Sequence, residues 1–214
     1  MPGSMSLTPP LRGLVLAGGQ SRRMGADKAT LQVGGMSLLD RAVINLEAVV
    51  DEVYVAVKPG QIDEPVRRKF SVIEDMFADI GPAAGLLSAH VSYPESAWLV
   101  IACDMPLLGE PILNFLCNAR DAQRDATALA VAADQSAEPL CAIYEPGTLA
   151  AFLVQVGAGG NSSPRSWLAS VRTKKLTTPV EGALLSANTT TELARMIENI
   201  ESRPSAFDRK PGNE

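Results

Sequence analysis

Residues 13–28 read GLVLAGGQSRRMGADK, an apolar run that ends in a double glycine and continues into basic residues. The run at 13–17 predicts a buried strand that enters a tight turn at Gly18 and Gly19. Glycines in such a turn let backbone N–H groups approach phosphate oxygens, because no Cβ lies in the way. The stretch therefore predicts the first strand of an α/β fold, followed by a phosphate-binding turn.

Basic side chains cluster directly after these glycines, at Arg22, Arg23 and Lys28. Arginine grips phosphate through paired donors and lysine supplies a compact charge, so both residue types suit a nucleotide. The spacing matches neither a Walker A loop nor the dinucleotide pattern G-x-G-x-x-G. A glycine turn with solvated arginines is the alternative interpretation. The position of Arg23 and Lys28 after the first strand favours phosphate binding.

Outward from this stretch, strand and helix patterns alternate. Further strands are predicted at residues 53–57, 72–73, 98–102, 127–132 and 139–144. Helices are predicted at residues 37–49, 81–90, 111–116, 148–156 and 166–171, with a last one that starts at Thr189. This alternation implies right-handed crossovers and a three-layer, doubly wound α/β fold with a mostly parallel sheet.

Two aspartates follow predicted strands, at the edge where such sheets bind ligands. Asp75 comes after the strand at 72–73, and Asp104 comes after the continuous apolar run at 98–102. A carboxylate at the end of a buried strand suits Mg²⁺, which prefers oxygen ligands and shares its shell with substrate phosphates. A lone aspartate that caps a turn is an equally common arrangement. The agreement between topology and motif position predicts an active site at this edge.

Three weaker candidates lie elsewhere along the chain. Gly81 and Gly85 flank a predicted helix start, which would favour an anion or a base edge, and an ordinary loop with a helix start is a stronger alternative here than for the first two motifs. Arg165 lies at a loop-to-helix junction, where it could bind a second phosphate or be exposed. Asn188 could act at a site or cap the last helix. His90, the single histidine, lies on an apolar helix face and is interpreted as structural.

Composition narrows the class of protein. Of the 214 residues, 46% are hydrophobic and 20% are charged, and the net charge of −5 argues against a broad nucleic-acid surface. No apolar run reaches the length of a membrane span, and the start lacks a signal-peptide pattern. Three widely spaced cysteines indicate reduced thiols in a cytoplasmic protein. We expect a disordered leader or tag scar at 1–10, a single domain at 11–201 and a mobile tail at 202–214.

Taken together, these motifs resemble the molybdenum cofactor guanylyltransferase family, in order and approximate spacing, over about residues 11–200. The resemblance is carried by Leu16-Ala17-Gly18-Gly19 with Arg23-Met24-Gly25 and Lys28, Val72-Ile73-Glu74-Asp75, Gly81-Pro82 with Gly85, Cys103-Asp104-Met105-Pro106, Glu138-Pro139-Leu140 and Asn188-Thr189. The first motif alone indicates only the wider nucleotidyltransferase superfamily, and the ensemble favours the guanylyl branch.

The resemblance implies a Rossmann-like nucleotidyltransferase fold. It also implies an enzyme that transfers GMP from GTP to molybdenum-molybdopterin and releases pyrophosphate. It implies Mg²⁺ on Asp104, and cofactor-delivery or molybdoenzyme proteins as possible partners, with no nucleic acid or membrane. Catalytic roles would fall to Lys28, Asp104 and Arg23. The nucleotide would be bound by Leu16, Ala17, Gly18, Gly19, Lys28, Asp75, Gly81, Gly85 and Asp104. The acceptor would be bound by Arg165 and Asn188.

The sequence departs from the family pattern at residues 55–58, which read VAVK where relatives often have a nucleotide-contacting asparagine, and at Ser186 and Thr190. Nucleotide choice depends on a few pocket contacts, so the alternative within this enzyme class is a cytidylyltransferase for the same cofactor, or a nucleotidyltransferase for a sugar-phosphate acceptor. A non-catalytic nucleotide-binding protein on the same fold is the alternative from another class.

Overall fold

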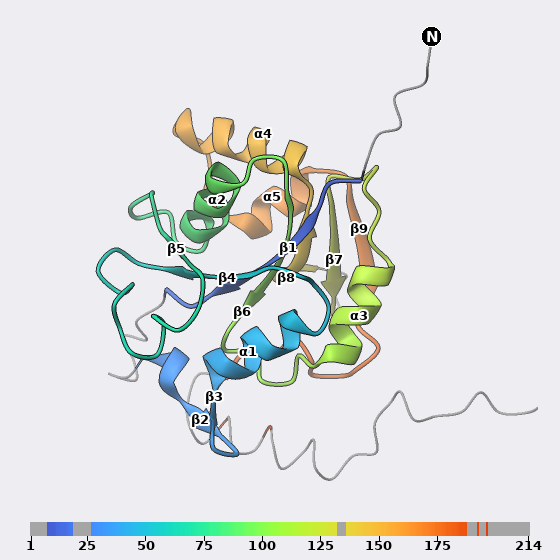
Figure 1. The fold of residues 1–214 in the computed structure, drawn as a ribbon. Helices are drawn as coiled ribbons and strands as arrows, with labels where there is room; N and C mark the ends of the chain where they lie inside the picture. The colour runs from blue at the N-terminus through green and yellow to red at the C-terminus, as the bar shows by residue number, and fades with distance from the viewer. Residues whose placement is uncertain (1–7, 19–26, 132–135, 188–191, 193–195, 197–214) are drawn as a thin grey trace, which may run out of the picture.

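A twisted sheet runs through the middle of the computed structural model, which describes residues 8–18, 27–131, 136–187, 192 and 196. Its seven strands follow the order β5-β4-β1-β6-β8-β7-β9 (Figure 1). Their bounds are β1 Leu11–Leu16, β4 Val53–Val57, β5 Val72–Glu74, β6 Ala97–Ala102, β7 Ala126–Ala130, β8 Ala137–Tyr144 and β9 Thr173–Thr177. All neighbours pair in parallel except β8, which is antiparallel to both β6 and β7. The predicted mostly parallel sheet is confirmed.

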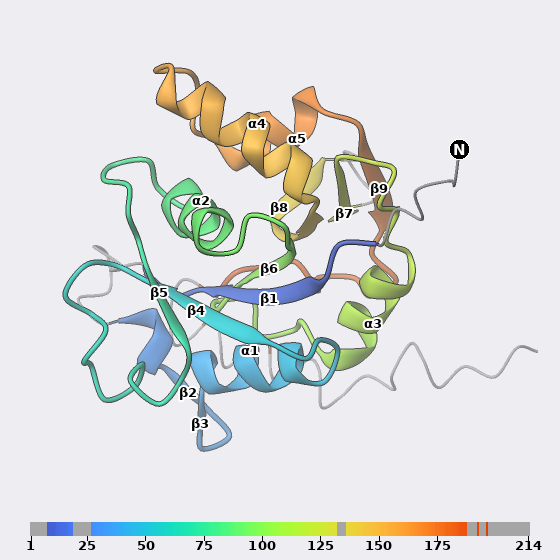
Figure 2. The same cartoon turned by 45° about the horizontal axis from the view of Figure 1, so that its top comes forward.

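Helices cover both faces of this sheet (Figure 2). On one face lie α1 (Leu38–Glu47) and α3 (Glu110–Asn118), and on the other lie α2 (Ala83–Ser92), α4 (Pro146–Gly157) and α5 (Pro164–Ser170). Each face has its own buried apolar cluster. The predicted three layers are therefore confirmed. No helix within the described ranges is long and apolar enough to cross a membrane.

Strand β6 shows why the apolar run at 98–102 becomes a central strand. Every residue of β6 is buried. Leu99 and Ile101 join the cluster under α1 and α3, whereas Trp98 and Val100 join the cluster under α2 and α4. Successive side chains of a strand point to opposite faces, so a strand covered on both sides must be apolar throughout.

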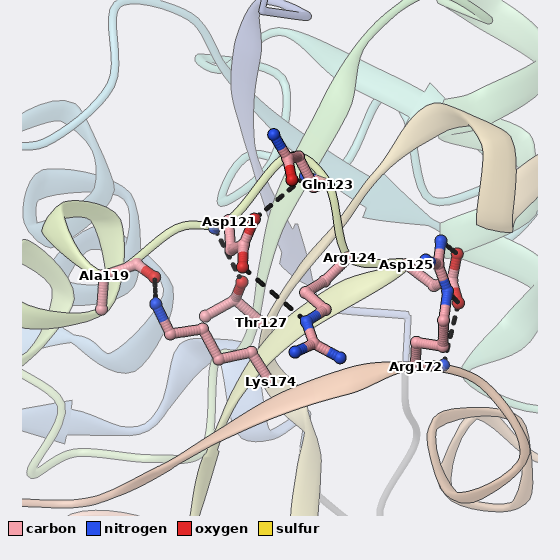
Figure 3. A network of polar contacts seen from close by, with 8 residues as sticks. All are labelled: Ala119, Asp121, Gln123, Arg124, Asp125, Thr127, Arg172 and Lys174. Atoms are coloured by element: carbon pink, nitrogen blue, oxygen red, sulfur yellow. Dashed lines mark hydrogen bonds and ion pairs between the residues drawn. The ribbon is translucent and has the colours of Figure 1, made fainter.

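The edge strand β9 was not predicted, because its sequence TKKLT carries no apolar alternation. Polar contacts hold its start against the loop before β7 (Figure 3). Arg172 grips both carboxylate oxygens of Asp125, at 3.1 Å each, and its backbone N–H donates to the same group. The Lys174 Nζ donates to the carbonyl of Ala119 at 2.8 Å. Charged side chains are typical of edge strands, where they discourage pairing with other chains.

Three small elements between β1 and α1 were also not predicted. A one-turn helix, η1 (Lys28–Thr30), is followed by the short strands β2 (Gln32–Val33) and β3 (Met36–Ser37). Gly34 and Gly35 join these strands with positive φ angles, which glycine adopts without a steric penalty. Of the helix predicted from Thr189, only Glu192 and Met196 are described, and both are helical. The predicted tail and most of the predicted leader lie outside the described residues.

Helix α2 approaches the sheet at Gly85 more closely than a side chain allows. A Cβ placed on Gly85 would lie 2.7 Å from the Cβ of Ala56 and 2.8 Å from the Cδ2 of Leu16. Both neighbours belong to strands in the middle of the sheet, so neither can move aside easily. The glycine therefore sets the distance between α2 and the sheet.

We expect Gly85→Ala to lower the free energy of unfolding by about 1–3 kcal/mol, because the added methyl group overpacks this contact. Urea denaturation measures this difference in the free energy of unfolding, provided that its dependence on urea concentration is the same in both proteins. Gly147→Ala in α4 is the matched control, since nothing lies within 4 Å of its Cβ position. Equal denaturation midpoints for the two variants would contradict the close approach.

Candidate active site

The strand order reverses beside β1, and this reversal places the candidate site. From β1 the chain continues to β4 and β5 on one side, then returns as β6 on the other side. Ligands of open α/β sheets bind at the carboxyl ends of the strands at such a reversal. A cleft of about 960 Å³ opens there. Seven residues predicted from the sequence line it, namely Leu16, Gly18, Lys28, Asp75, Gly81, Gly85 and Asp104.

An ion pair between Lys28 and Asp104 lies on one side of the cleft. Lys28 Nζ is 2.7 Å from Asp104 Oδ2, although the residues are far apart in the sequence. Both side chains are 18% exposed, so the pair is partly shielded from water but open to the cleft. Asp104 follows β6, and Lys28 begins η1, which Asp27 caps by accepting from the Ala29 N–H at 3.0 Å. The fold thus brings a cation and an anion together at the strand ends.

Asp75 lies on another side of the same cleft, directly after β5. Its backbone N–H donates to the carbonyl of Val57 at 2.8 Å, which extends the pairing between β4 and β5. Its Oδ1 atom is buried and has no hydrogen-bond partner among the described residues. Burial raises the pKa of Asp75 to about 6, and Glu74 also raises it, whereas Lys58 opposes the shift. A buried oxygen without a partner is suited to accept a hydrogen bond from a ligand.

Backbone conformation shapes the cleft near Asp75. Gly18 comes so close to the neighbouring strand end that a Cβ there would lie 3.3 Å from the backbone nitrogen of Lys58. Gly81, before α2, has a φ of +62°, which favours glycine. Ala17 does not line the cleft. Its N–H donates to Ala56, and its carbonyl accepts from Arg67, so both of its backbone groups have protein partners.

Arg165 lies outside the main cleft, in a neighbouring hollow of about 370 Å³. Its guanidinium donates to Glu138 Oε2 at 3.1 Å and to Ser136 Oγ at 3.0 Å. The hollow and the cleft share Pro82 and Leu140, so the two spaces adjoin. The remaining predicted site residues, Gly19, Arg23 and Asn188, lie outside the described residues.

The structure adds cleft residues that the sequence did not single out for the site. Lys58 follows β4, at the same edge as Asp75 and Asp104, and the strand-end rule could have identified it. Residues 76–79 also line the cleft, but their sequence MFAD carries no recognisable motif. His90 is buried in α2 and does not line the cleft, as its structural interpretation requires.

The family described as the MobA-like NTP transferase domain matches residues 13–176 of this chain. The chain belongs to this family. The matched range contains β1, β4, β5 and β6, whose carboxyl ends carry the cleft.

Individual relatives of the chain agree with this family assignment. The molybdenum cofactor guanylyltransferase of Burkholderia vietnamiensis is 31% identical over 202 residues, and the match covers 89% of this chain and 97% of that protein. A molybdenum cofactor biosynthesis bifunctional protein from Synechocystis is 34% identical over 145 residues, but the match covers 67% of this chain and only 41% of that protein. Two further bacterial relatives are covered over 66% and 63% of their length.

Solved structures show the same fold. The molybdopterin-guanine dinucleotide biosynthesis protein A of Archaeoglobus fulgidus has a TM-score of 0.72 at 20% identity, and the likeness covers 90% of this chain and 100% of that chain. At this level of identity the comparison concerns the fold of the MobA-like domain alone.

The raised pKa of Asp75 predicts a pH-dependent stability of this MobA-like domain. The pKa is higher in the folded than in the unfolded chain, so the folded state is destabilised as Asp75 ionises, from about pH 4 to about pH 6. We therefore expect Asp75→Asn to raise the unfolding temperature above about pH 6, with a gain that shrinks as the pH falls toward 4. Calorimetry across this range measures the gain.

Asp63→Asn is the control for this experiment, because Asp63 is exposed and lies outside the cleft. A gain in unfolding temperature that is equal at both ends of the pH range would contradict the role of burial at Asp75.

Proposed function

We propose that this chain transfers GMP from GTP to molybdenum-molybdopterin, which forms the guanine dinucleotide form of the cofactor and releases pyrophosphate. The observation that carries the proposal is the Lys28–Asp104 pair in the cleft at the strand reversal of a MobA-like domain. The choice of guanine and of the acceptor is supported by relatives named guanylyltransferases that match along nearly their whole length.

The residues of the cleft suit an attack by a phosphate on a phosphate. The terminal phosphate of the acceptor would attack the α-phosphorus of GTP, the bond from that phosphorus to the bridging oxygen would break, and pyrophosphate would leave. The attacking phosphate is already ionised near neutral pH, so no side chain needs to remove a proton. Lys28 would hold the triphosphate and offset its charge, and alignment would supply much of the rate. Arg23 is proposed as a second cation on the phosphates.

Mg²⁺ is the cofactor that we propose, held by Asp104. Within the described ranges, no group of three or more histidine, cysteine, aspartate or glutamate side chains could hold a metal ion. A magnesium ion that arrives with a nucleotide needs only one or two carboxylates, because phosphates and water complete its shell. The partly exposed carboxylate of Asp104 meets this requirement. The ion would neutralise charge on the phosphates.

The rest of the site follows from the same cleft. We assign Asp75 to the guanosine part, because its buried Oδ1 lacks a partner among the described residues. Backbone groups of Leu16, Gly18, Gly81 and Gly85 would line the nucleotide. Arg165 and Asn188 are proposed for the acceptor, which the adjoining hollow would receive. The free cysteines of the chain support a location in the cytoplasm.

The test is GTP-dependent release of pyrophosphate with molybdenum-molybdopterin as acceptor, with CTP and UTP in parallel. We expect release with GTP and a loss of about 100-fold or more in kcat for Asp104→Asn, at an unchanged unfolding temperature. Asp63→Asn should retain full turnover. Release only with CTP would replace the guanylyl by a cytidylyl activity, and near-normal turnover of Asp104→Asn would contradict the metal role.

We expect Lys28→Ala to lower kcat/KM for GTP by about 100-fold, because it removes a cation from the triphosphate. Lys175→Ala removes an exposed lysine of β9 outside the cleft and should leave kcat/KM unchanged. Steady-state kinetics at saturating acceptor measure both variants. An unchanged rate and GTP affinity in Lys28→Ala would remove Lys28 from the site.

A further inference from the structure

Arg67 is a fully buried arginine in the segment between β4 and β5. Its side chain has 0% exposed surface, although the neighbouring Arg68 is exposed. Burial of a guanidinium is unfavourable unless acceptors and opposite charges surround it. The contacts of Arg67 should therefore show what this charge stabilises.

The contacts of Arg67 reach both ends of the glycine-rich segment at residues 18–26. Its Nη2 donates to the carbonyl oxygen of Ala17 at 2.8 Å. Its Nη1 lies 2.6 Å from Asp27 Oδ2 and also pairs with Glu64. Burial alone would lower the pKa of Arg67, but the hydrogen bonds and ion pairs with Asp27 and Glu64 raise it, so the guanidinium remains charged.

The two ends that Arg67 contacts are the last residue before Gly18 and the residue before Lys28. Asp27 uses its other oxygen, Oδ1, to cap η1 through the N–H of Ala29. Its successor Lys28 is paired with Asp104. One side chain thus joins the end of β1 to the start of η1. Arg67 itself does not line the cleft, so it can affect a ligand only through these partners.

We propose that Arg67 is a positioning residue that holds the two ends of residues 18–26 together and, through Asp27, sets Lys28 beside Asp104. Arginine suits this task because its planar fork donates in two directions at once, whereas lysine has a single point charge. The catalytic consequence rests on the proposed function, but the structural part does not depend on it.

The structural part is tested by hydrogen–deuterium exchange of the full-length protein without ligand. In Arg67→Lys and in Asp27→Asn, we expect amide exchange at Ala17 and in residues 29–31, whose N–H groups donate at the two ends that Arg67 joins, to become about 10-fold faster, while exchange in β6 stays unchanged. Arg68→Met, the exposed neighbour, should match the wild type. Unchanged exchange at Ala17 and in residues 29–31 of a folded Arg67→Lys would overturn the proposal. Asp27→Asn carries the same test if Arg67→Lys does not fold.

The catalytic part is tested by steady-state kinetics with GTP and Mg²⁺. A misplaced Lys28 should raise KM for GTP and lower kcat together, whereas a smaller folded fraction would lower only the apparent kcat. The double variant Arg67→Lys with Asp27→Asn should lose less than the sum of the two single variants, because both changes break the same Arg67–Asp27 contact. Additive losses, or an unchanged KM, would overturn the positioning of Lys28. Faster exchange in a protein that uses no GTP would support the role of Arg67 and overturn the proposed function instead.

Discussion

The parallel pairing of β1 with β6 is the contact on which the site depends. It aligns Leu16 with Ala102, the last residues of the two strands, although most of the first half of the chain lies between them. Whatever follows each strand must therefore emerge at the same edge of the sheet. Gly18 and Asp104 both line the cleft for this reason, and Lys28 can pair with the carboxylate of Asp104.

The packing around this pair limits how the site can be built. β1 and β6 are covered on both faces, so the polar groups of the site can lie only beyond the strand ends. Gly85 brings α2 down onto β1 and β4, which sets its N-terminal end beside Asp75. The close contact of α2 with the sheet at Gly85 thus both stabilises the fold and shapes the cleft.

The sequence predicted the parts of the molecule that burial controls. The run at 98–102 predicted a central strand, and the strand-end rule brought Asp75 and Asp104 to one cleft. β9 escaped prediction because edge strands need no apolar pattern, and it pairs through its backbone and a few charged side chains. Arg67 escaped because an arginine among polar residues has the pattern of a solvated loop. Only the tertiary structure shows that it is buried on Ala17 and Asp27.

Burial of Asp75 also makes ligand binding at the site depend on the protonation of this side chain. A carboxyl group with a pKa of about 6 holds a proton on a small fraction of molecules near neutral pH. A ligand that donates hydrogen bonds to this group binds its ionised form more tightly, so binding favours release of the remaining proton. The apparent affinity for such a ligand then falls as the medium becomes acidic, and the heat of binding includes the protonation enthalpy of the buffer. The carboxyl group that we assign to guanosine recognition therefore makes ligand binding depend on pH.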